Sequence, residues 1–410
     1  MTGYLIELRR RFVLLLGALT FLAVAVMLAV ALGTWRGLWM ETATAVTKAA
    51  LVAYPVGAAA AAHRASRGRR LGGDRTAEVA ARPLPQAHGA RLAALLTAVT
   101  GGYVTAAAGA YLLSAASGAT GHPWLSYPVF SALGLIAVTA LGYGVGALLS
   151  SRFTAAAVGL TTFVALLFSK DTIWAYAVPN GWPGKVLDPT QTWARLVIVL
   201  GLCALAVAVA CLRRPGWLAR PRTLLAVAAL LTVTGLAVAN SAGPLLTARE
   251  PARPVCRKVD AHSEVCVWPE HVPYLADLTA DTRRINAALS RTLTPPRTYV
   301  EEGLTPNDAM GFVPGYGRDA LRANLAGLAL PTFRTCPKES DNALDRRLRA
   351  TDHLTAWLAA RSADARTVPG AVTYDQDAEL RATVNKVLRT TEAEQARRVK
   401  QWLRQQEAPC

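Results

Sequence analysis

The chain has 410 residues, of which 52% are hydrophobic and only 17% are charged, and its mean hydropathy is +0.27. Soluble domains usually carry about a quarter charged residues, so this composition excludes an ordinary soluble protein over the whole length. The deficit of charge is confined to the region before residue 246. We therefore expect two parts, a transmembrane helical domain at 1–246 and an extracytoplasmic soluble domain at 247–410.

The formal net charge is +17. Residues 1–246 hold 20 Lys and Arg against 6 Asp and Glu, whereas residues 247–410 hold 24 against 21. The soluble half is thus nearly balanced and lacks the basic stripe that nucleic-acid binding requires. Basic clusters beside apolar runs are typical of membrane topology and of contact with anionic lipid. We expect membrane lipid as a partner and no nucleic acid.

Seven apolar runs follow in chain order, each bounded by polar or turn-forming residues. A helix needs about 20 apolar residues to cross the hydrocarbon core. The fifth run is short for a complete crossing, and the first is longer than a signal-peptide core, so we expect it to stay uncleaved. The expected spans are 12–32, 43–62, 92–114, 127–149, 153–169, 194–212 and 223–246.

The loop His63–Arg91 sets the sidedness. Its seven arginines face only two acids, and short cationic loops stay on the cytoplasmic side. The segment Met1–Arg11, expected to form a short interfacial helix, is then cytoplasmic. Seven crossings place 247–410 outside a bacterial plasma membrane. If the fifth span did not cross, the arginines of 213–222 would lie outside, so the charge pattern favours an odd number.

The small residues of the third and fourth spans predict a closely packed bundle. The aromatic segment Lys170–Trp193 contains three prolines. It is equally compatible with short interfacial or partly re-entrant pieces and with an ordinary outer loop.

The soluble domain begins with a predicted β-hairpin, because the β-favouring runs Val255–Val259 and Glu264–Trp268 flank a turn-forming segment. A three-residue loop, Asp260–His262, would place Cys256 opposite Cys266 within disulfide range. A four-residue loop would put them on opposite faces, and the sequence does not choose. Amphipathic helices are expected at 270–293, 341–361 and 375–406, from their apolar spacing. The segments 294–306 and 313–317 are expected to be connectors.

Four cysteines lie on the predicted outer side: Cys256, Cys266, Cys336 and Cys410. An even number in an oxidising compartment indicates two disulfides. Of the three pairings we favour 256–266 with 336–410, and free thiols are the alternative. The sequence lacks the CxxC and Hx3–5H spacings of a zinc site, so we expect no metal.

No constellation in the sequence indicates catalysis. HExxH, GxSxG and Walker A motifs are absent, so we expect no enzyme and no catalytic residue. Glu270–His271 alone is weak support for a metalloprotease. The pairs Glu301–Glu302 and Asp375 with Asp377 are interpreted as solvated surface carboxylates.

Three features of the membrane half occur together in one family. An interfacial segment, YLIELRRR, leads into the first span; a charged inner loop follows the second; and an aromatic outer segment, Asp171–Trp193, lies further on. Over about 1–212 the chain resembles the permease subunit of an ABC-2-type transporter. The resemblance implies that the matching segment Gly73–Ala81 is a coupling helix that docks on a separately encoded ATPase.

Within that segment, the resemblance implies partner-binding roles for four residues: Asp74, Thr76, Glu78 and Val79. Asp74 is suited to cap a helix at its N-terminus. The chain itself would hold no cofactor, and ATP would act through the partner. Permeases of this family usually have six spans with both ends inside, whereas this chain adds a seventh and an outer domain. That domain resembles those that trail some actinobacterial permease-like proteins.

Two functional hypotheses follow. In the first, two permease subunits pair with two cytoplasmic ABC ATPases and transport a substrate. In the second, a non-transporting anchor or sensor holds a disulfide-stapled outer domain that binds a ligand or an envelope partner.

Overall fold

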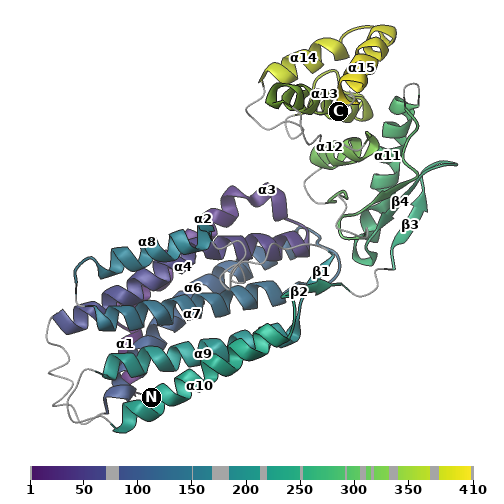
Figure 1. Cartoon of the computed structure of the whole chain (residues 1–410). Coiled ribbons are helices and arrows are strands. Elements are labelled where there is room, and N and C mark those ends of the chain that lie inside the picture. The colour runs from purple at the N-terminus through teal and green to yellow at the C-terminus, as the bar shows by residue number, and fades with distance from the viewer. Residues whose placement is uncertain are drawn as a thin grey trace. The chain divides into compact units, whose positions relative to one another are not determined.

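The computed structural model describes residues 2–70, 83–149, 151–168, 184–212, 219–249, 253–290, 293–304, 311–314, 318–331, 340–369 and 378–407. The chain divides into two compact units (Figure 1). The membrane unit comprises Met1–Ala119, Pro123–Gly181 and Lys185–Ala248. The C-terminal unit comprises Thr120–His122, Trp182–Gly184 and Arg249–Cys410.

The membrane unit is helical, as predicted. Six of its described helices are long and apolar enough to cross a bilayer: α2 (Arg11–Val30), α4 (Trp39–Arg70), α6 (Leu84–Ala116), α7 (Ser126–Leu148), α9 (Pro189–Cys211) and α10 (Ala219–Ser241). Three shorter helices accompany them: α1 (Thr2–Leu8), α3 (Leu32–Trp35) and α8 (Thr154–Phe168). The apolar runs that predict membrane spans are thus helical in the structure. The short helix α1 lies within Met1–Arg11, the segment expected to form an interfacial helix.

The basic loop is shorter than predicted, because helices occupy both of its ends. α4 has 32 residues and continues to Arg70, and α6 has 33 and begins at Leu84. Ala and Arg favour helix, and Pro85 is tolerated in the first turn of α6. At 1.5 Å per residue each helix is about 50 Å long, well beyond the roughly 30 Å hydrocarbon core. We call this end of the bundle the loop end.

The opposite end, which we call the ribbon end, carries two short strands. β1 (Lys185–Leu187) and β2 (Leu246–Ala248) pair antiparallel, with Val186 opposite Thr247. The prediction that the last span reaches Leu246 is therefore wrong: α10 ends at Ser241, and Gly243 has a positive φ of +80°. Residues 184–193 of the aromatic segment form β1 and the start of α9, and residues 170–183 lie outside the described residues.

Polar contacts inside the ribbon end join α9 to α10. The side chain of Asp188 accepts a hydrogen bond from the backbone of Gln191 at 2.9 Å and caps α9. The buried amide of Gln191 donates to the carbonyls of Ala239 and Gly243, each at 2.7 Å. These bonds satisfy backbone groups that a helix terminus leaves unpaired.

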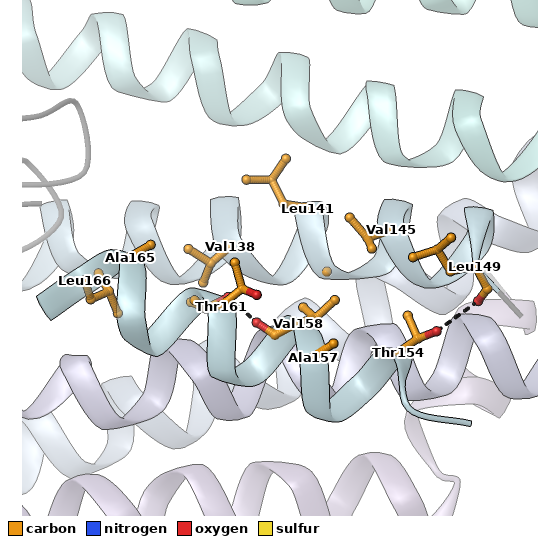
Figure 2. Close-up of a pocket in the computed structure, with 12 residues that line it drawn as sticks. Val138, Leu141, Val145, Leu149, Thr154, Ala157, Val158, Thr161, Ala165 and Leu166 are labelled. Atoms are coloured by element: carbon orange, nitrogen blue, oxygen red, sulfur yellow. Dashed lines mark hydrogen bonds between the residues drawn. The ribbon is translucent and has the colours of Figure 1, made fainter. Parts of the chain in front are cut away.

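The predicted fifth span corresponds to α8, which has only 15 residues and spans about 22 Å. α7 runs toward the loop end, because its Tyr127 hydroxyl donates to the Lys185 carbonyl at the ribbon end, 3.0 Å away. α8 starts beside the last turn of α7 and runs back along it (Figure 2). The two helices are therefore antiparallel.

Glycines allow α7 to press against α4. A Cβ atom at Gly142 would lie 2.3 Å from the carbonyl oxygen of Ala58, and one at Gly146 would lie 2.4 Å from that of Ala62. Such close backbone approach is typical of helix pairs in membranes, where small residues line the interface. In Figure 1, α4, α6 and α7 form the centre of this unit.

The C-terminal unit combines a small sheet with helices around one apolar core. The sheet has the order β3 (Val255–Lys258), β4 (Glu264–Val267) and β5 (Thr298–Val300), with β4–β5 parallel. After a 3₁₀ turn (Pro269–Tyr274) come α11 (Leu275–Leu289), α12 (Arg318–Ala329), α13 (Asp341–Ser362), α14 (Ala378–Leu388) and α15 (Glu392–Gln406). The buried stripes expected on the helices are confirmed on α11, α14 and α15. On α13 the stripe is confirmed only in part, because Leu354 and Trp357 are buried but Leu348 is 43% exposed.

Three features of this unit differ from expectation. β5 lies inside a predicted connector, α12 was not predicted, and the helix expected at 375–406 is two helices. The strand forms because Tyr299 is buried and its backbone pairs with Val265. Tertiary pairing of this kind overrides the local preference of a Pro-rich segment.

The β3–β4 hairpin has the three-residue loop, Asp260–His262. Cys256 therefore faces Cys266, with their Cα atoms 4.1 Å apart, and a disulfide joins them. Cys336 and Cys410 lie outside the described residues, so their predicted pairing stays a prediction.

Replacing Gly142 by Ala should destabilise the membrane unit, because the new methyl group meets backbone of α4 that has no room to move. The matched control is Gly109→Ala, since a Cβ atom there meets nothing within 4 Å. We expect Gly142→Ala to lower Tm in nanodiscs by several degrees. The control should leave Tm unchanged or raise it, because Ala favours helix. Equal effects of the two substitutions would contradict this packing.

Asp260 should make the C-terminal unit sensitive to acid. Burial acts to raise the pKa of its carboxyl, but hydrogen bonds from Asn286 and from the backbones of His262 and Ser263 outweigh it and hold this pKa below 3.8. A lowered pKa stabilises the fold above about pH 4, and this contribution is lost as pH falls through the folded-state value.

The measurement compares the Tm of isolated 249–410 with that of its Asp260→Asn variant between pH 7 and pH 2.5. The variant should be less stable at pH 7, and the difference should shrink toward the acid end. A difference that stays constant over the range would show that the carboxylate charge contributes nothing.

Candidate functional site

The predicted coupling segment Gly73–Ala81, with Asp74, Thr76, Glu78 and Val79, lies outside the described residues. What the structure does describe is how its two ends are held. The segment leaves α4 after Arg70 and joins α6 shortly before Leu84. The site is therefore built from the helices that carry this segment.

A carboxylate at the loop end joins three helices. Glu7 of α1 is paired with Arg64 of α4 at 3.1 Å and with Arg91 of α6 at 3.8 Å. Arg10, three residues further along the chain, lies 3.0 Å from the same carboxylate. We call Glu7, Arg10, Arg64 and Arg91 the Glu7 cluster.

The Glu7 cluster is partly shielded from solvent. The side chain of Glu7 is 12% exposed, and those of Arg64 and Arg91 are 19% and 22% exposed. Ion pairs in such positions are screened less than surface pairs, and removal of one partner leaves an uncompensated charge. Glu7 therefore fixes α1 to the cationic ends of α4 and α6.

Further side-chain contacts extend this connection across the loop end. The Tyr4 hydroxyl lies 3.0 Å from Thr97 Oγ1 of α6, and the His63 ring lies 6.0 Å from that of Phe12. The buried His88 of α6 is within 2.9 Å of the Tyr143 hydroxyl of α7. Polar and ring contacts thus link α1, α2, α4, α6 and α7 at the loop end.

The sequence analysis assigned no role to Glu7. Its one signal was charge. On the inner segments expected from topology, Glu7 is the one acid outside the predicted coupling segment, and three arginines, Arg9, Arg10 and Arg11, follow it closely. An acid in that position needs a cationic partner. Sequence spacing does not reveal that the partner is Arg64, because 57 residues separate the two.

A pocket of about 510 Å³ lies between α7 and α8 (Figure 2). Its walls are almost wholly apolar, with Val138 and Val145 on α7 opposite Ala157 and Thr161 on α8. The side chain of Thr162 donates to the Val158 carbonyl of its own helix at 2.8 Å, so this hydroxyl is already paired. The pocket is suited to hydrocarbon.

The C-terminal unit holds a buried carboxylate that the sequence analysis misjudged. Glu301 was interpreted as a solvated surface residue, but it is only 1% exposed. One carboxylate oxygen lies 2.5 Å from Nδ1 of His271, and the other accepts the Trp268 backbone N–H at 2.9 Å. Burial raises the pKa of Glu301, although the contact with His271 opposes this rise.

The partners of Glu301 explain the error. Polar groups are buried when hydrogen bonds satisfy them, and both partners come from the 268–271 segment, which sequence spacing does not place near residue 301. Asp375 and Asp377 lie outside the described residues.

One group of metal-ligating side chains occurs in the described residues, namely Cys256, Glu264 and Cys266. The two sulfurs are bonded to each other. They therefore offer no thiolate, which is the form of cysteine that binds metal.

The C-terminal unit also contains a pocket. It lies between α14 and α15, has a volume of about 520 Å³ and is lined largely by polar side chains. Its lining includes three cations, Lys386, Arg397 and Arg398, and one acid, Glu394. The Arg398 guanidinium is partly engaged, because it donates to the Gln401 side chain at 2.7 Å. The excess of positive charge favours an anionic group.

Comparison with known proteins adds one finding about this unit. A family described as a domain of unknown function, DUF7224, matches residues 265–409. The match begins in β4 and extends past α15, so this part of the chain is similar to that family. Searches among curated proteins and among solved structures find no match to the chain.

The Glu7 cluster should behave as a coupled unit. We expect Glu7→Gln and Arg64→Met each to lower Tm of the protein in nanodiscs by about 3 °C or more. The first leaves the arginines of the cluster without their acid, and the second removes the cation through which α4 holds Glu7. The double variant should be no less stable than the worse single variant. The control Arg10→Met should have little effect, since the Arg10 side chain is 49% exposed. Additive losses in the double variant would refute coupling.

Proposed function

We propose that the chain is the membrane permease subunit of an ABC-type transporter, and that it couples to a separately encoded cytoplasmic ATPase. The observation that best supports this proposal is the Glu7 cluster. It joins α1, α4 and α6 at the end of the bundle where α4 ends before the segment 71–82 and α6 begins after it. A partner bound to that segment would act on three helices together.

The direction of the helices supports seven crossings. α7 and α9 both start at the ribbon end, as Tyr127 and β1 indicate. The chain must therefore return from the loop end between them, and α8 runs in that direction. With about 22 Å of helix, α8 is short for the roughly 30 Å core. Local thinning of the bilayer or coverage by neighbouring helices would make up the difference.

In the proposed topology the loop end lies in the cytoplasm, in accord with the positive-inside rule. The N-terminus is then cytoplasmic and residues 249–410 are extracytoplasmic, where the disulfide between Cys256 and Cys266 is stable. The protein would lie in a bacterial plasma membrane. Because the sequence has no Walker A motif, ATP would be bound by the partner.

The extended ends of α4 and α6 explain how motion would reach the membrane. Each helix is longer than the bilayer core is thick. Pro55 lies inside α4 and removes one of its backbone hydrogen bonds, so a displacement of the segment 71–82 would tilt α6 and move the part of α4 that follows Pro55. Through Gly142 and Gly146, α4 is in close contact with α7, which carries the motion to the other side of the bundle. In this mechanism two copies of the permease, or two paired permeases, enclose the transport path.

The direct test is co-purification with the ATPase. Replacing Gly73–Ala81 by a Gly/Ser linker of equal length should reduce the amount of ATPase recovered at least tenfold, while Tm of the permease in nanodiscs stays the same. A matched variant, Glu7→Gln, should keep most of the ATPase bound but lower permease-stimulated ATP hydrolysis. If the linker variant retains the intact complex, the proposed coupling segment is wrong.

A second function is favoured by a different observation, the cation-lined pocket between α14 and α15. In this alternative the membrane unit is an anchor, and the C-terminal unit, which contains the DUF7224 match, binds an anionic ligand or an envelope partner. Absence of an ATPase gene beside this one, together with ligand binding by isolated 249–410, would support it. Loss of that binding in Arg397→Gln would assign it to the pocket.

A further inference from the structure

The apolar pocket between α7 and α8 is a groove with a defined length. On α8 its lining runs from Thr154 to Ala165 and Leu166, and on α7 from Val138 to Leu149. Eleven residues of helix separate Thr154 from Ala165, which corresponds to about 17 Å. This is close to the depth of one leaflet of the hydrocarbon core, which is half of about 30 Å.

The two ends of the groove differ in chemistry. At the end nearest the α7–α8 turn, the Thr154 hydroxyl donates to the Leu149 carbonyl, 3.5 Å away. The turn itself presents Ser151 and Arg152, both exposed, and Phe153, which is 78% exposed. A cation and an aromatic ring together are typical of the membrane–water interface. Arg152 does not line the groove, but it lies only two residues before Thr154, so a positive charge is present in the turn next to this end of the apolar groove.

We propose that this groove binds one anionic phospholipid, with an acyl chain between α7 and α8 and the phosphate at Arg152. A phospholipid matches both ends of the groove: its chain fills the apolar lining and its headgroup carries the charge that Arg152 attracts. A free phosphate ion would leave the apolar lining uncovered. A helix of a second copy would leave Arg152 without a partner unless it brought an acid to the same depth.

The length of α7 gives the physical reason for a bound lipid at this place. α7 has 23 residues, or about 35 Å of helix, which is enough to cross the roughly 30 Å hydrocarbon core. Because α7 ends at the turn that carries Arg152, the turn lies near the membrane–water interface in a bilayer. A phospholipid held at Arg152 would have its headgroup at this depth and its acyl chain along the groove.

The experiment is native mass spectrometry of the full-length protein in detergent, titrated with phosphatidylglycerol or with phosphatidylcholine of the same acyl chains. The wild type should bind one phosphatidylglycerol before any phosphatidylcholine. Arg152→Gln should weaken phosphatidylglycerol binding about fivefold, because one cation near a membrane surface contributes roughly that factor. Arg9→Gln, which removes an exposed cation outside the groove, is the matched control and should bind as the wild type does.

A second pair of variants tests the acyl chain. Ala157→Phe fills the groove, whereas Ala156→Phe adds the same ring to the adjacent exposed position, which does not line it. The first should abolish the tightly bound lipid and the second should keep it. Thr161→Phe gives an independent filled groove in case Ala157→Phe does not fold, with circular dichroism as the check of folding.

Three results would overturn the proposal. Equal lipid binding by Ala157→Phe and Ala156→Phe would mean that the lipid is general annular lipid. A shift from dimer to monomer in Ala157→Phe, without a loss of lipid, would identify the groove as an interface between copies. Displacement of the lipid by sodium phosphate alone would show that the acyl chain contributes no affinity.

Discussion

Close backbone contact between α4 and α7 is the constraint on which the membrane unit depends. In lipid there is little hydrophobic drive to bring helices together, so association depends on packing and on polar contacts. Gly142 and Gly146 place the backbone of α7 against Ala58 and Ala62. α8 packs on α4, and α9 packs on α7. The positions of α8 and α9 therefore depend on the contact between α4 and α7.

At the loop end, ion pairs hold the helices together. The arginines that mark the cytoplasmic side in the sequence are usually explained by topology alone. Here two of them, Arg64 and Arg91, also hold the carboxylate of Glu7. The same charges therefore serve orientation and packing. This double use makes the N-terminal helix part of the structural frame around the segment that we propose as the contact with an ATPase.

Much of the fold was predictable from local patterns, because apolar length and charge placement dictate where helices can lie in a membrane. The hairpin was predicted, but its sequence was compatible with two loop lengths, and only the structure shows the register that pairs Cys256 with Cys266. What failed depended on contacts between distant residues: Tyr299 pairs with β4 to make a third strand, and His271 buries Glu301. The described part of the candidate site was not predicted. The coupling segment came from a family resemblance and lies outside the described residues, and Glu7 acquired a role only when Arg64 was found beside it.

The β1–β2 ribbon determines which hydrogen bonds would bear a load applied to the chain after residue 248. Residue 249 follows β2 directly, and β2 is held to β1 by antiparallel backbone pairing. Tension applied along the chain from the C-terminal unit would first load these hydrogen bonds, and the Gln191 contacts behind them, before it reached α10. Because β1 leads into α9 and β2 follows α10, a load on residue 249 would be shared between the two helices.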